Sequence, residues 1–152
     1  MSVTLTQERE VETPFEEDFL RYVAEITLGK VKLPGLGDKQ IQLGVAAVSE
    51  EKIQSLNKEY RGNDKTTDIL SFGDEVNFIE AGVLPEGEEF VLGDLIYSPD
   101  FIKRAALEDG ISEKHEMIYI FSHGVLHLLG FDHSDEMFAI QDEVTEEIVK
   151  TI

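Results

Sequence analysis

The fold depends on one stretch, residues 112–133, which reads SEKHEMIYIFSHGVLHLLGFDH. Ser112 can cap a helix at its N-terminus, and apolar residues then surround most of the stretch as far as Gly130. A helix that is apolar on most sides is buried, so we expect this one to lie at the centre of the protein. Gly130 can end the helix in a left-handed conformation and reverse the chain.

Three histidines in this stretch have the spacing of a metal site. Four residues advance a helix by about 400°, so His123 and His127 project from one face, one turn apart. The reversal at Gly130 returns His133 toward these two imidazoles. A single histidine on an apolar helix is usually a core residue, but three of the chain's four histidines fall here. We therefore predict a metal ion bound by His123, His127 and His133.

The ligand types indicate the metal and its chemistry. The chain has no cysteine, which excludes disulfides, Cys-type zinc sites, iron–sulfur clusters and thiol catalysis. Three imidazoles are typical of a catalytic zinc, which keeps a coordination position open for water. Such an ion can lower the pKa of its water toward ~7 and polarise a phosphoryl or carbonyl oxygen. We therefore expect one Zn²⁺ ion and a hydrolytic reaction.

Acidic residues near the histidines are candidates for supporting roles. The spacing matches the zinc-protease motif H-E-x-x-H-x-x-G-x-x-H, but Gly124 stands where that motif has its glutamate base. Asp132 can orient an imidazole or activate the water, or it can be a simple turn residue. Glu116 shares the helix face of His123, yet we expect it to be solvated or to cap the helix. His115 is expected to be a surface or packing residue.

Strands and helices alternate along the rest of the chain, as in a layered α/β domain. Apolar or alternating runs predict strands at residues 2–6, 41–48, 67–72 and 91–97, the first of them an edge strand. Residues 74–89 are acidic and contain Gly and Pro, and we predict no regular structure there.

Capping residues mark the starts of the other helices. Thr13, Pro14 and Glu16 together have the pattern of a capping box with proline at the first helical position. Ser49 and Ser98 can cap two further helices. A last amphipathic helix is predicted at about residues 135–150 by its periodicity.

Charge and terminal composition restrict the partners and the compartment. Against 13 Lys and Arg stand 32 Asp and Glu, giving a formal net charge of −19 at pH 7. This charge repels polyanions, so any role on RNA requires a local basic cleft. The first residues lack the pattern of a signal peptide, and no apolar run approaches the ~20 residues that cross a bilayer. We expect a cytoplasmic protein that does not bind membranes.

Two motifs resemble those of the YbeY family, bacterial metal-dependent endoribonucleases that act in ribosomal RNA maturation. Residues 123–133 match every fixed position of the family motif H-G-x-L-H-L-x-G-[YF]-D-H. Residues 61–72, RGNDKTTDILSF, resemble its segment R-G-x-D-K-P-T-D-V-L-S-F-P, and residues 93–98, GDLIYS, resemble its strand G-D-I-x-I-S. Thr66 and Gly73 replace two family prolines, and the stretch after His133 is shorter than usual.

The resemblance implies a fold and a substrate. The fold is α/β (α+β): one domain, residues 1–152, with a small mixed four-stranded sheet flanked by helices and the metal site on the central helix and the loop after it. The implied substrate is single-stranded RNA, in rRNA processing that includes 16S rRNA maturation and ribosome quality control, with no role for DNA. Ribosomal proteins or the small ribosomal subunit are expected partners because they can supply the positive charge that this chain lacks.

The resemblance also implies that Arg61 lies near the metal cleft. A guanidinium can bind two phosphate oxygens and stabilise charge as a phosphodiester is attacked. Lys65 can add a charge to the same wall. The alternatives are a loop-stabilising ion pair for Arg61 and a solvent-exposed position for Lys65.

Two other functions stay open. A metalloprotease or amidohydrolase could use the same three histidines, although Gly124 counts against it. A non-catalytic ribosome assembly factor could hold a structural metal and dock its acidic surface on a basic partner. Folding stability with and without a chelator separates this last function from catalysis.

Overall fold

The computed structural model describes residues 1–74 and 76–152, and in these ranges four strands and six α-helices form an α+β fold. The strands are β1 (Ser2–Arg9), β2 (Gln40–Ala47), β3 (Ile69–Phe72) and β4 (Glu89–Tyr97). The helices are α1 (Glu17–Gly29), α2 (Glu50–Arg61), α3 (Phe78–Ala81), α4 (Pro99–Asp109), α5 (Glu113–Leu129) and α6 (Asp135–Val149). A short 3₁₀ turn, Leu36–Asp38, precedes β2.

The sheet is mixed, as expected, with the strand order β1-β2-β4-β3. β1 pairs with β2 and β2 with β4 in parallel, whereas β3 runs antiparallel to β4. The register between β2 and β4 shifts at Gln42/Leu43. β1 is an edge strand, which confirms the prediction for the first residues.

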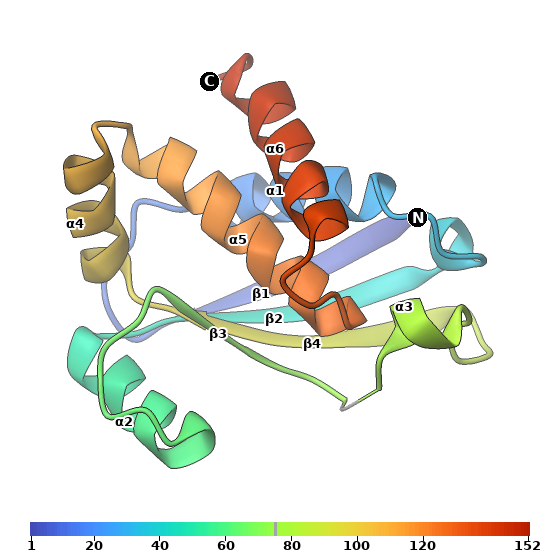
Figure 1. The fold of residues 1–152 in the computed structure, drawn as a ribbon, viewed down its shortest axis with the longest axis horizontal. Coiled ribbons are helices and arrows are strands. Elements are labelled where there is room, and N and C mark those ends of the chain that lie inside the picture. The colour runs from blue at the N-terminus through green and yellow to red at the C-terminus, as the bar shows by residue number, and fades with distance from the viewer. Residues whose placement is uncertain (75) are drawn as a thin grey trace.

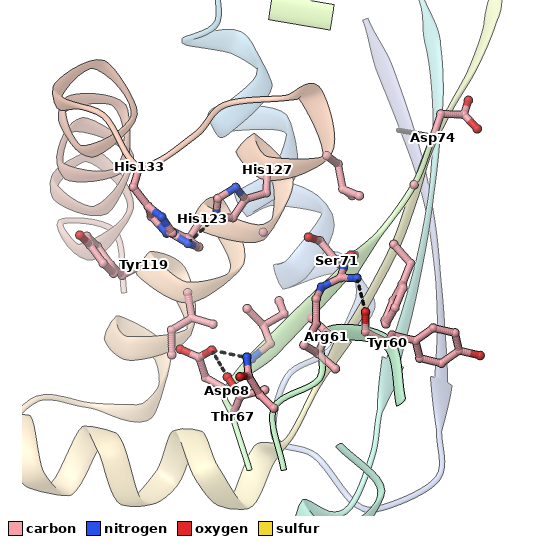
Figure 2. Close-up of a pocket in the computed structure, with 18 residues that line it drawn as sticks. Tyr60, Arg61, Thr67, Asp68, Ser71, Asp74, Tyr119, His123, His127 and His133 are labelled. Carbon is pink, nitrogen blue, oxygen red and sulfur yellow. Dashed lines mark hydrogen bonds between the residues drawn. The ribbon is translucent and has the colours of Figure 1, made fainter. Parts of the chain in front are cut away.

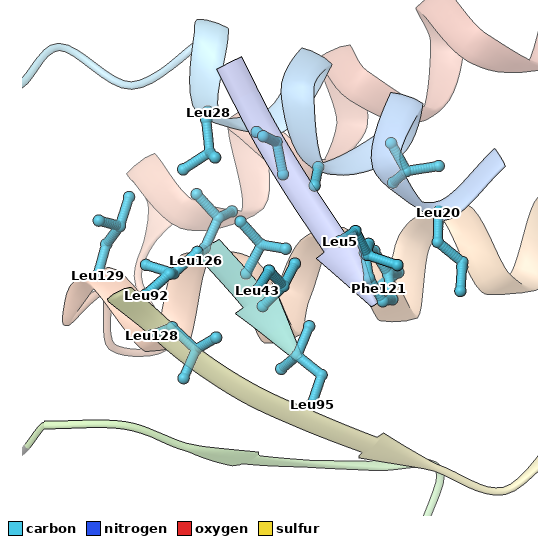
Figure 3. Close-up of a cluster of buried hydrophobic side chains, with 14 of the residues drawn as sticks. Leu5, Leu20, Leu28, Leu43, Leu92, Leu95, Phe121, Leu126, Leu128 and Leu129 are labelled. Atoms are coloured by element: carbon cyan, nitrogen blue, oxygen red, sulfur yellow. The ribbon is translucent and has the colours of Figure 1, made fainter. Parts of the chain in front are cut away.

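The main core lies between one face of the sheet and α1, α5 and α6 (Figure 1). Alternation along β1 turns Val3 and Leu5 toward these helices and leaves Thr4 and Thr6 exposed. α5 is buried on most sides, as its sequence predicts, and its side chains interleave with leucines of the sheet (Figure 3). Complete burial of each such Leu, Ile or Phe contributes roughly 1.5–3 kcal/mol.

A smaller cluster on the opposite face of the sheet holds α2. Ile53 of α2 is fully buried against Val48 and Leu70. This packing fixes the end of α2 beside β3, and Figure 1 shows α2 alone on this side of the sheet, apart from the three long helices. The position of α2 matters because its last residue, Arg61, is a candidate functional residue.

The first helix begins later than predicted. Its N-cap is Glu16, which makes no side-chain capping bond, so the predicted capping box on Thr13 is wrong. The Thr13 hydroxyl accepts a hydrogen bond from the Phe15 amide at 3.2 Å and shares another with the Tyr97 hydroxyl at 2.7 Å. Glu16 pairs with Arg9 at 2.9 Å. The Thr13 and Glu16 side chains therefore hold the segment that leads into α1, and neither caps the first turn of the helix.

The other caps occur where they were predicted. The hydroxyls of Ser49, Ser98 and Ser112 accept the amides of Lys52, Phe101 and His115, the third residue of each helix. Among the described ranges, no helix combines the length and the apolar character that a bilayer span requires.

The acidic segment 74–89 contains the short helix α3, so the prediction of no regular structure is wrong there; residue 75 of that segment lies outside the described residues. Asn77 caps α3 through the Glu80 amide at 2.9 Å. Phe78 is buried edge-on against Phe90 of β4, with ring centroids 5.1 Å apart. This tertiary contact with β4 supports a helix too short to form alone.

Candidate active site

α5 and the turn after it bring three imidazoles together. His123 and His127 lie on the last two turns of α5, and Gly130, with a φ of 105°, ends the helix and turns the chain back toward His133. One ring nitrogen of each histidine lies within 4.8 Å of the other two. Figure 2 shows the three rings converging on one point. Together they can hold one metal ion, the geometry that the sequence predicts.

The protonation of the half-buried histidines suits a cation. His127 Nδ1 lies 2.8 Å from the Phe131 carbonyl oxygen, which can only accept, so Nδ1 carries the proton. The lone pair of His127 Nε2 therefore points toward His123 Nε2, 2.8 Å away. Burial lowers the pKa of both residues, and for His123 the neighbouring His127 lowers it further. Both rings are neutral near pH 7, and neutral imidazole is the form that binds metals.

Arg61 is held on the opposite wall by β3. Its Nη2 donates to the Ser71 carbonyl oxygen at 2.6 Å, and its Cζ lies 5.0 Å from the centroid of the Phe72 ring. A longer bond of 3.4 Å joins Nη1 to the Tyr60 carbonyl oxygen. These contacts use two of the five guanidinium N–H groups. Within residues 1–74 and 76–152, Arg61 pairs with backbone carbonyls and with no carboxylate, so the predicted ion-pair alternative has no support there.

A cleft of about 940 Å³ separates the histidines from Arg61. Exposed aromatic side chains line it: Tyr60 is 56% exposed and Tyr119 38% exposed. Asp68 also faces the cleft, and its carboxylate accepts the Ile69 amide at 2.6 Å (Figure 2). The cleft thus combines three imidazoles, a guanidinium and flat aromatic surfaces.

Two predicted acidic residues lie outside this cleft. The Asp132 carboxylate accepts the His133 amide at 2.9 Å, is 3.9 Å from His133 Nδ1, and is 96% exposed. It is a turn residue that faces solvent. Glu116 is half-buried on α5, where burial and then a hydrogen bond to Asp109 raise its pKa to about 7. His115 is half-buried at the start of α5, apart from the three histidines.

Lys65 is exposed and does not line the cleft; its carbonyl oxygen accepts a hydrogen bond from Asn57 Nδ2 at 3.0 Å. Of the two basic residues singled out in the sequence, only Arg61 shares the cleft with the histidines.

Two groups that contact the histidines were not predicted from the sequence. They are the Phe131 carbonyl, already described, and Gln141 of α6, whose Oε1 lies 3.3 Å from His123 Nδ1. Gln141 is fully buried, and it interrupts an apolar stripe made by Met137, Ile140, Val144 and Ile148. A polar residue at a core position was therefore the available signal, because a buried amide needs hydrogen-bond partners.

Known proteins are similar to this chain in sequence and fold. The family described as "Endoribonuclease YbeY" matches residues 3–151. A protein named Endoribonuclease YbeY from Desulforamulus reducens is 41% identical over 128 residues, covering 82% of this chain and 80% of the relative. Another of that name from Lachnoclostridium phytofermentans is 34% identical and covers 100% of this chain and 95% of the relative. The solution structure of TM1509 from Thermotoga maritima has a TM-score of 0.60 at 26% identity, covering 97% of this chain and 91% of that one.

Proposed function

The chain belongs to the YbeY family, and on that premise we propose that it is a zinc-dependent endoribonuclease that cleaves single-stranded RNA during rRNA processing. The observation that carries this proposal is the joint position of three converging histidines and Arg61 on facing walls of one cleft. Within rRNA processing we propose 16S rRNA maturation and ribosome quality control as its tasks. We propose that this activity takes place in the cytoplasm.

His123, His127 and His133 are the proposed metal ligands. Their fit rests on the chemistry of the donors: a proton fixed on His127 Nδ1 leaves its Nε2 with a lone pair that faces the other two rings. Three imidazoles without a thiolate suit zinc. When bound, a divalent ion of this kind supplies a Lewis acid that polarises a phosphoryl oxygen and activates water.

Arg61 is proposed to bind the phosphate of the scissile bond. Its contacts with Ser71 and Phe72 hold the guanidinium against β3 before RNA arrives, so little side-chain freedom is lost on binding. The remaining N–H groups can form two parallel bonds to phosphate oxygens. Asp132, bonded to the His133 amide, is proposed to limit the orientation of the His133 ring from the solvent side.

The aromatic residues of the cleft favour an unpaired strand. Tyr60 and Tyr119 present exposed rings on which bases can stack, and a base inside a duplex is not available for stacking on protein. The formal net charge of −19 opposes long-range attraction of RNA. We therefore propose that a ribosomal protein or the small ribosomal subunit brings the enzyme to its substrate.

Cleavage by metal-stripped and zinc-loaded protein tests the proposal. A fluorescently labelled single-stranded rRNA fragment should be cut only by loaded protein, and the same sequence in a duplex should be cut much more slowly. Arg61→Ala should slow cleavage by about 100-fold. Arg21→Ala is the matched control, because Arg21 is an arginine of α1 whose hydrogen bond is to Asp18 on its own helix.

Two results would contradict the proposal. The first is unchanged cleavage by the metal-stripped protein. The second is a zinc-loaded protein that gains folding stability but cuts no RNA, which would favour the assembly-factor alternative.

A further inference from the structure

Gln141 connects α6 to the metal-binding helix through two hydrogen-bonded groups. It is fully buried, and its Oε1 lies 3.3 Å from His123 Nδ1. Its Nε2 donates to the Tyr119 carbonyl oxygen, also at 3.3 Å. A carbonyl can only accept, so this second bond fixes which end of the amide faces His123.

The orientation of the amide determines the tautomer of His123. With Oε1 facing the ring, His123 must carry its proton on Nδ1, and its Nε2 keeps a lone pair. The alternative is a proton on Nε2. In that tautomer Nε2–H would donate to His127 Nε2, only 2.8 Å away, and both nitrogens would be blocked for a metal.

We propose that Gln141 is a positioning residue that holds His123 in the Nδ1-protonated tautomer and so prevents a hydrogen bond between His123 and His127 that would close the metal site. The inference rests on the proposed metal-dependent function. Beyond that function, the inference is that a side chain of α6, 18 residues away in the sequence, determines the tautomer of His123. His127 needs no such side chain, because the Phe131 carbonyl performs the same task.

Two substitutions separate this role from general packing. Gln141→Leu fills the apolar stripe of α6 but removes the acceptor, so His123 can shift its proton to Nε2. Gln141→Glu keeps an oxygen acceptor for Nδ1–H and should retain the native tautomer. Gln141→Met, which is unbranched like Gln, replaces the leucine variant if that one does not fold. Thr27→Val is the control, because Thr27 is a fully buried polar residue of α1 whose hydroxyl donates to the Val23 carbonyl oxygen on its own helix.

The experiment has two readings. Two-bond ¹⁵N–¹H spectra of the metal-free proteins report the tautomer of His123 directly. Competition with a chromophoric chelator reports the dissociation constant for Zn²⁺ alone. We expect Gln141→Leu to move the His123 proton to Nε2 and to weaken Zn²⁺ binding by roughly 10-fold to 100-fold, while the glutamate and Thr27 variants keep the native tautomer and bind within a few-fold of wild type.

The outcomes decide the proposal in either direction. An Nε2-protonated His123 in the wild-type protein overturns it, and so does native Zn²⁺ affinity in the leucine or methionine variant. Equal loss of affinity in the Thr27 variant also overturns it, since the effect would then be general destabilisation. If the wild-type protein binds no Zn²⁺, the proposed function fails, and the tautomer spectra still decide what Gln141 does to His123.

Discussion

Gly124 lies so close to Leu95 that a Cβ atom at position 124 would be 2.8 Å from Leu95 Cδ2. The same atom would be 3.1 Å from Ile69 Cδ1. Because of this contact, α5 rests directly on β4 and β3 between its two histidines. A glutamate at position 124, which the protease motif requires, would force the Leu95 side chain or the helix itself to move. The close packing is therefore a structural argument against the protease alternative.

Gly124→Ala should lower the free energy of unfolding by about 1–3 kcal/mol. Overpacking against Leu95 outweighs the gain of up to about 1 kcal/mol that alanine brings to a helix. Urea denaturation followed by circular dichroism measures the change. In Gly29→Ala the new methyl group meets no atom within 4 Å at the end of α1, so that variant should be as stable as wild type or more so. Equal stability of the two variants would show that the contact with Leu95 is not tight.

Local patterns in the sequence were sufficient to predict α5 and the convergence of its two histidines on one face. The apolar surround, the Ser112 cap and the four-residue spacing all lie within one helix, where periodicity directly determines position. The resemblance to a known family added the mixed sheet and Arg61, which no local pattern of residues supplies.

The features that were missed depend on contacts between distant segments. Thr13 looks like a cap, but its hydroxyl bonds to Tyr97, 84 residues away, and the helix starts later. Gln141 of α6 contacts His123 of α5, a neighbour that is distant in the sequence. α3 forms where Phe78 meets Phe90. Local propensity is a weak guide wherever such tertiary contacts decide the structure.

Gly130→Ala should weaken both folding and metal binding. An alanine at this position would have to adopt a φ of 105°, and its Cβ would lie 2.7 Å from Asn77 Cα. The cost should be about 1–3 kcal/mol in unfolding free energy, and displacement of His133 should weaken Zn²⁺ binding at least about 10-fold. Calorimetric titration and urea denaturation measure the two effects. Gly110→Ala, also left-handed but free of contacts within 4 Å, should lose stability without any change in Zn²⁺ affinity.

Zinc should stabilise the fold through His133. At a free Zn²⁺ concentration 1,000 times the dissociation constant, the free energy of unfolding should rise by about 4 kcal/mol, and a chelator should reverse the gain. Thermal unfolding with and without chelator measures it. His133→Ala removes one of the three converging rings and should lose most of the gain, whereas His115→Ala, in the first turn of α5 and outside the cluster, should retain it. A His115 variant that behaves like the His133 variant would contradict this assignment.

Glu116 should make folding stability depend on pH. Burial, a hydrogen bond to Asp109 and the charges of Asp109 and Asp68 raise its pKa from 4.5 to about 7. A raised carboxyl pKa means that the folded state binds more protons than the unfolded state between these values, so stability is fully present below about pH 4.5 and falls as pH rises to about 7. Because the side chain is only half-buried, we expect the loss to be about 1 kcal/mol.

Glu116→Gln should remove this loss, because a neutral amide can donate to the Asp109 carboxylate and carries no negative charge to repel it. The variant should be more stable than wild type at pH 8 and equally stable at pH 4, as measured by urea denaturation across the range. Glu113→Gln removes the same charge from the first turn of α5 and tests whether net charge alone explains the gain. If the two variants differ from wild type by the same amount at pH 8, the pair of Glu116 and Asp109 is not the cause.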